Sequence, residues 1–107
     1  MKTYILNTPI LTRYGQWHYE GPLSVLQAQK ILTQGFVSAV GHQASAEFLS
    51  YLLDTKIEMN RIQITMERGD IALVLNLTTR LPENLILTDK AQIEALPYEL
   101  GLLKYLK

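Results

Sequence analysis

The feature that most constrains the fold is the apolar run of residues 71–77, IALVLNL. Because nearly every position is apolar, a strand formed here would need cover on both faces. We therefore expect this strand near the centre of a sheet. The residues before it, Glu67-Arg68-Gly69-Asp70, are typical of a hairpin turn, since Gly69 tolerates a positive φ angle.

Other segments have the composition or the alternation of strands. Pro97 and Gly101 favour a strand over a helix for the first half of the final segment, although that segment is ambiguous. A short extended segment is expected at residues 85–87. Besides the central run, strands are predicted at residues 3–6, 16–20, 61–66 and the first half of 98–107.

Three helices are predicted from helical periodicity and capping residues. The first follows Ser24 and ends near Gly35, the second covers residues 38–53 to about Asp54, and the third is short, from residue 88 or 89 to about Ala95. Residues 36 and 37 are expected to form a buried connector. The result is a single α/β (α+β-like) domain over residues 1–107, with one mixed sheet of about five strands and helices packed on it.

Composition excludes several classes of protein. The chain has no cysteine, and two histidines leave little scope for a metal site. It shows neither a membrane-spanning run nor a signal-peptide pattern, and a cytoplasmic location is expected. Ten basic and ten acidic residues, with no basic stripe, argue against binding long nucleic acid. A small anion held by a few arginines remains compatible with these features.

His42 lies at the N-terminal end of the apolar face of the second predicted helix and is surrounded by small residues. The free N–H groups at a helix N-terminus suit a phosphate. We therefore take His42 as a candidate catalytic residue, with Ser38, Gly41 and Ser45 as candidate ligand-binding residues around it. The alternative is a capped helix whose first histidine packs on a neighbour. The other histidine, His18, is expected at a solvent-side or edge position.

Two arginines and two asparagines also need an explanation. Arg61 follows Asn60 at the start of a predicted strand, and Arg80 precedes Leu81-Pro82-Glu83 after the central strand. Arginine binds phosphate in a bidentate manner, but surface ion pairs with Glu67 or Glu83 are the alternative for both. Asn7 and Asn76 lie at or near strand ends, where turn hydrogen bonding is the alternative to ligand contact.

Taken together, these motifs resemble the viral ring-nuclease family, whose members act as anti-CRISPRs against type III systems and have relatives on bacterial mobile elements. The resemblance covers nearly the whole chain. It rests on the order and spacing of Leu6-Asn7-Thr8, Ser38-Ala39-Val40-Gly41-His42, Leu49-Ser50, Asn60-Arg61, Gly69-Asp70-Ile71-Ala72, Arg80-Leu81-Pro82-Glu83 and Tyr98-Glu99-Leu100-Gly101.

The resemblance implies a homodimeric, metal-independent phosphodiesterase that opens cyclic tetra-adenylate and uses no cofactor. His42 matches the family's catalytic histidine, and Arg80 and Glu83 match the arginine and glutamate of its site. Arg61 matches a second phosphate-binding arginine and Asn7 a ligand-contacting asparagine. The chain departs from one viral branch at Asn76, where that branch has glutamine, and near Ile10, where it has a ligand-contacting serine.

The implied chemistry suits these residue types. The 2′-OH of an RNA-type linkage attacks the adjacent phosphorus, so the protein needs no nucleophile of its own. Arginines neutralise the phosphate, and a histidine protonates the leaving 5′ oxygen. Two rival functions remain open at the level of sequence: a protein that sequesters the ring without cutting it, and a small DNA-associated regulator of a mobile element.

Overall fold

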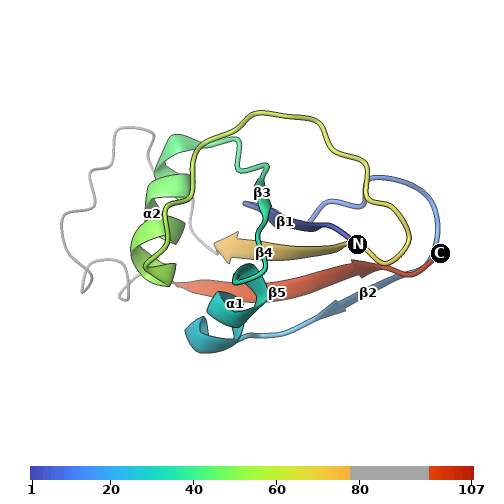
Figure 1. Ribbon diagram of the computed structural model, residues 1–107, viewed down its shortest axis with the longest axis horizontal. Helices are drawn as coiled ribbons and strands as arrows, with labels where there is room; N and C mark the ends of the chain where they lie inside the picture. The colour runs from blue at the N-terminus through green and yellow to red at the C-terminus, as the bar shows by residue number, and fades with distance from the viewer. Residues whose placement is uncertain (78–96) are drawn as a thin grey trace.

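Five strands form one mixed sheet in the order β2-β5-β4-β1-β3 (Figure 1). The structure is a computed structural model that describes residues 1–77 and 97–107. The predicted fold class is confirmed. In chain order the elements are β1 (Thr3–Leu6), β2 (Trp17–Glu20), α1 (Val25–Leu32), β3 (Val37–Ser38), α2 (Gln43–Leu53), β4 (Ile71–Leu77) and β5 (Tyr98–Tyr105).

The apolar strand β4 lies at the centre of the sheet, as its composition predicts. It pairs in parallel with β1, where Leu6 lies opposite Val74, and antiparallel with β5, where Val74 lies opposite Gly101. Residues 72–75 of β4 are all buried. The final segment is a strand along its whole length to Tyr105, so the expected strand at its first half is confirmed and extends further.

The two faces of the sheet are covered by different parts of the chain. On one face α1 and α2 pack over β-strand side chains such as Ile5, Leu73 and Leu75, with Phe48 fully buried between helix and sheet. On the other face no helix packs within the described ranges; the connection from α2 to β4 supplies Met66 and Ile64 instead. This long connection arches away from α2 and returns to the sheet beside the chain termini (Figure 1).

The first helix begins where the sequence predicts. The Ser24 hydroxyl accepts from the Gln27 amide at 3.1 Å, and the Gln27 side chain accepts from the Ser24 amide at 2.8 Å, which makes a capping box.

The second helix begins at Gln43, so the prediction of a helix from residue 38 is wrong. Residues 37 and 38 form the edge strand β3 instead, because they pair in parallel with β1. Val37 is 41% exposed, so the expected buried connector is also wrong. The helix ends at Leu53, close to the predicted end, and its C-cap Asp54 has a φ of 51°.

Residues 61–66 do not form a strand, contrary to prediction. Their alternation has another cause: Met66 is buried against the sheet and Ile64 is half-buried, whereas Ile62 is 44% exposed. The segment is extended and crosses the sheet face instead of pairing with it, so it shows the period of a strand without a ladder. The turn after it is confirmed, with Gly69 at φ 87° and the Asp70 amide donating to the Glu67 carbonyl at 2.9 Å. It is not a hairpin, because only one of its flanks is a strand.

The short extended piece predicted at residues 85–87 and the helix predicted at residues 88–95 lie outside the described residues. Within the described ranges, no helix has the length and apolar character needed to cross a membrane.

Candidate functional site

The N-terminus of α2 has no side-chain cap. His42 is the N-cap, with an extended backbone (φ −134°, ψ 124°) and no hydrogen bond from its side chain to the helix. Its carbonyl accepts from the Ala46 amide at 3.0 Å. The first N–H groups of a helix have no intrahelical acceptor, and here the capping side chain does not supply one. The helix end therefore presents donors suited to an anion.

The imidazole of His42 is the most unusual side chain of this region. Both ring nitrogens, Nδ1 and Nε2, are buried and make no hydrogen bond with any residue that the structure describes. Buried polar atoms without a partner are uncommon and cost free energy, so each needs an explanation. The alternative, a histidine that packs on a neighbour at the start of a capped helix, stays open: the ring is buried, but its side chain makes no capping hydrogen bond.

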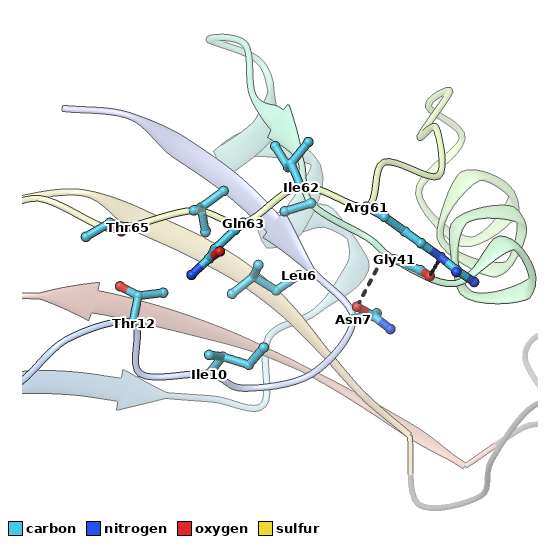
Figure 2. A pocket seen from close by; sticks show the side chains of 11 residues that line it. Leu6, Asn7, Ile10, Thr12, Gly41, Arg61, Ile62, Gln63 and Thr65 are labelled. Carbon is cyan, nitrogen blue, oxygen red and sulfur yellow. Dashed lines mark hydrogen bonds between the residues drawn. The ribbon is translucent and has the colours of Figure 1, made fainter.

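Arg61 is fixed beside this helix end by Gly41, the residue before His42. The Arg61 Nε–H donates to the Gly41 carbonyl at 2.8 Å, and the Gly41 amide donates weakly to Asn7 Oδ1 at 3.5 Å. Figure 2 shows Arg61, Gly41 and Asn7 together at one end of a pocket. Among the described residues Arg61 makes no ion pair with Glu67, which pairs with Arg13 at 3.4 Å; the other alternative, a pair with Glu83, lies outside the described residues.

A set of backbone contacts positions the segment that carries Arg61. The Asn60 side chain donates to the Ser38 carbonyl at 2.8 Å, and the Asn60 amide donates to the Val40 carbonyl at 2.8 Å. The Ser38 hydroxyl donates to the Glu58 carbonyl at 2.6 Å. Ser38 and Asn60 thus join β3 to the connection after α2, and the Ser38 hydroxyl is used within the fold.

The two other serines of this part of the sequence, Ser45 and Ser50, are buried or hydrogen-bonded within the protein. Ser45 is 5% exposed in the first turn of α2. The Ser50 hydroxyl lies 2.7 Å from the Ala46 carbonyl and accepts from the Ile57 amide at 2.9 Å, so it ties the chain after α2 back to the helix. The Leu49-Ser50 part of the sequence motif therefore has a structural role.

A pocket of about 490 Å³ opens beside Arg61, on the sheet face away from the helices. Sequence reasoning named several of its lining residues but missed others, because it assigned residues 61–66 to a strand. The alternation of apolar and polar residues over 61–66 was the sequence signal that could have indicated these lining residues. The lining residues are Leu6, Asn7, Ile10, Thr12, Ala39, Gly41, Arg61, Ile62, Gln63, Ile64 and Thr65 (Figure 2).

Asn76 does not line this pocket. It is exposed on β4 opposite Glu99 and lines a smaller cavity of about 210 Å³ together with Tyr19. There, burial and the nearby Glu99 carboxylate raise the pKa of Tyr19. Arg80 and Glu83, the other two candidate catalytic residues, lie outside the described residues.

His18 lies on the edge strand β2, as expected, and its Nε2 is 3.2 Å from Glu20 Oε2, with both side chains about half exposed. Among residues 1–77 and 97–107, no group of three or more histidine, aspartate or glutamate side chains is arranged to hold a metal ion.

The fold is that of a small α+β protein, with His42 and Arg61 near the start of α2 and an open pocket beside Arg61. The chain belongs to the STIV B116-like family, which it matches over residues 3–100. It has the same fold as B116 of Sulfolobus turreted icosahedral virus, with a TM-score of 0.80 and 22% sequence identity over 98% of this chain and 100% of that one.

Its relatives include viral and bacterial proteins. It is 36% identical over 103 residues to uncharacterized protein 26 of Sulfolobus islandicus filamentous virus, covering 92% of this chain and 87% of the relative. It is 35% identical over 107 residues to uncharacterized protein ORF117 of Acidianus two-tailed virus, covering 94% and 91%. It is 32% identical over 105 residues to uncharacterized protein YddF of Bacillus subtilis, covering 96% of each.

Proposed function

We propose that this protein is a metal-independent ring nuclease that binds and opens cyclic tetra-adenylate. The observation that carries the proposal is His42, whose two ring nitrogens are buried at a helix N-terminus without a partner among the described residues. Because both nitrogens are buried, the proposal requires that the ring become accessible on binding, so that the ligand can supply the partner they lack. The resemblance of the sequence to ring nucleases supplies the identity of that ligand.

Phosphate binding is supported by the donors that converge near His42. The Nε of Arg61 is held by Gly41, and its terminal guanidinium nitrogens make no hydrogen bond or ion pair with the described residues. The first turn of α2 adds backbone N–H groups. Charged and backbone donors together favour an anion more than either alone. Arg80 and Glu83 complete the proposed site by resemblance.

The proposed reaction is a transesterification within the substrate. The 2′-oxygen attacks phosphorus, a new P–O2′ bond forms and the P–O5′ bond breaks. The proton of the 2′-OH passes to a base, and His42 donates a proton to the departing 5′ oxygen. The products carry a 2′,3′-cyclic phosphate and a 5′-hydroxyl. Arginine contacts stabilise the charge on phosphorus oxygens in the transition state.

The functional context is also part of the proposal. A homodimer would present two copies of His42 and Arg61 to a ligand with matching two-fold symmetry. Destroying a type III CRISPR second messenger in the host cytoplasm would make the protein an anti-CRISPR. The viral relatives are consistent with such a role.

The test is a cleavage assay with labelled cyclic tetra-adenylate in excess EDTA, with His42→Ala as the control. We expect the parent protein to produce linear ends and the variant to produce none. Cleavage by the variant at the parent rate would refute the role of His42. Tight binding without turnover would instead indicate a sequestering protein. Salt-dependent retardation of duplex DNA would revive the regulator, although the formal net charge of zero argues against it.

A further inference from the structure

We propose that Asn60 is a positioning residue that sets Arg61 against the start of α2. This inference rests on the proposed function, since Arg61 is the phosphate-binding arginine of that proposal. Arg61 is exposed and lies on a segment that belongs to none of the helices and strands of the described chain. A long side chain in water has many rotamers, so a guanidinium held in one place needs a fixed backbone behind it.

The backbone of Asn60 fixes the chain on both sides of Arg61. Its amide donates to the Val40 carbonyl at 2.8 Å, and its carbonyl accepts from the Ile62 amide at 3.0 Å. The second bond makes a γ-turn with Arg61 at its centre. The residue before Asn60, Met59, pairs in parallel with Val40 as an isolated β-bridge. The backbone of Arg61 is therefore tied to the stretch that leads from β3 into α2.

The side chain of Asn60 adds a bond that few other residue types can make. Its NH₂ group donates to the Ser38 carbonyl at 2.8 Å in a partly buried position. An ionised aspartate has no donor, and an aliphatic side chain has no polar group, so neither can replace it. Ser38 is itself held, because it pairs with Ile5 of β1 and its hydroxyl donates to the Glu58 carbonyl at 2.6 Å. The side chain of Asn60 thus joins the segment of Arg61 to a point that the sheet fixes.

These contacts determine where the guanidinium of Arg61 lies. From this backbone position its Nε–H donates to the Gly41 carbonyl at 2.8 Å, and its terminal nitrogens have no partner among the described residues. Figure 2 shows the side chain extending from its segment toward Gly41 and the start of α2. Ser38 and Gly41 belong to the same short stretch of chain before α2. A shift of Asn60 relative to Ser38 would therefore move Arg61 relative to Gly41 and weaken the Nε–H bond.

The first test follows exchange of the Arg61 Nε–H with solvent by heteronuclear NMR in the ligand-free protein, with Arg61→Met to assign the signal. We expect exchange to be about 3- to 10-fold faster in Asn60→Ala than in the parent, as for the loss of one neutral hydrogen bond. Gln29→Ala is the matched control, because the Gln29 side chain also donates to a backbone carbonyl, that of Leu53, at 2.8 Å. It should lower stability to urea comparably and leave the exchange unchanged. Asn60→Leu, which cannot donate but keeps the bulk of the side chain, is used if the alanine variant fails to fold.

The second test is a double-mutant cycle for binding of cyclic tetra-adenylate, measured by calorimetry in the His42→Ala background. Asn60→Ala should weaken binding about 3- to 10-fold when Arg61 is present. It should cause no further loss in the Arg61→Met protein, because a residue that acts through Arg61 has no effect once that side chain is removed. A purely structural role of Asn60 would give the same loss in both proteins.

Two results would overturn the inference. If the Nε–H exchanges as slowly in Asn60→Ala as in the parent, Asn60 does not hold Arg61 in place. If Asn60→Ala costs the same affinity with and without Arg61, it acts by another route. A parent protein that does not bind the ring would refute the proposed function, but the exchange test needs no ligand and still decides the role of Asn60. Failure of the positioning role and failure of the ring nuclease are therefore distinguishable.

Discussion

Asp70 is a buried carboxylate whose removal should destabilise the protein. It is 3% exposed, and its two side-chain oxygens accept from the backbone amides of Lys2 and Glu67, each at 2.8 Å. Its own carbonyl accepts from the Tyr105 amide at 3.1 Å. Asp70 therefore joins the start of β1, the end of β5 and the last turn of the segment that forms one wall of the pocket.

The expected cost follows from these contacts. A hydrogen bond to a charged group contributes about 1.5–3 kcal/mol to stability, so two such bonds set an upper range of about 3–6 kcal/mol. Lys2 is exposed, and water can replace part of its lost bond. We expect Asp70→Ala to lower the free energy of unfolding by about 2–4 kcal/mol. Asp70→Asn keeps one acceptor but turns an NH₂ group toward an amide, so its cost should be intermediate.

The assay is urea unfolding followed by circular dichroism, with the slope of free energy against urea compared among variants. Glu58→Gln is the matched control, because it also removes one negative charge but from an exposed pair with Lys56 at 3.6 Å. We expect it to change stability by less than about 0.5 kcal/mol. An Asp70→Ala protein within that same margin of the parent would refute the reasoning.

Three further predictions concern the site and its surroundings. Arg61→Met should weaken binding of cyclic tetra-adenylate about 10- to 150-fold, because one charge-assisted contact is lost. Arg68→Met, on the exposed turn, is the control and should leave binding unchanged. Calorimetry in a His42→Ala background measures both affinities. Gly41→Ala should fold normally in urea unfolding, because its Cβ would meet only the Arg61 Cγ among the described atoms, at 3.5 Å, yet it should weaken ring binding by crowding the phosphate site. Burial and Glu99 raise the pKa of Tyr19, so the tyrosine of the unfolded chain loses its proton at a lower pH than that of the folded protein. Stability should therefore fall as pH rises through the alkaline range. In Tyr19→Phe, the midpoint of urea unfolding should depend less on pH over that range.

The elements that the sequence predicts well depend on local signals. The central strand β4 is recognisable because an unbroken apolar run can be buried only between two covered faces. The start of α1 is recognisable because Ser24 and Gln27 form a capping box within four residues. His42 could be singled out because it begins a helix among small residues.

The elements that the sequence predicts poorly depend on distant partners. Residues 61–66 alternate as a strand does, and no local feature indicates that they cross the sheet face and leave it unpaired. Ser38 was assigned to the second helix, although pairing with β1, more than 30 positions earlier in the chain, makes it part of an edge strand. In each of these two segments the local residue pattern is compatible with the predicted and with the observed conformation. Periodicity alone could therefore not decide between the two.

By itself the sequence determined the class of fold, the central strand, and the candidate residues His42 and Arg61, because periodicity, capping and residue chemistry act over short stretches. Only the tertiary structure decided that Arg61 is anchored to Gly41 and that Gln63 shares a pocket with both. It also separated Asn76 from that pocket. These relations depend on how strands and connections far apart in the chain meet at the sheet, which no local pattern encodes.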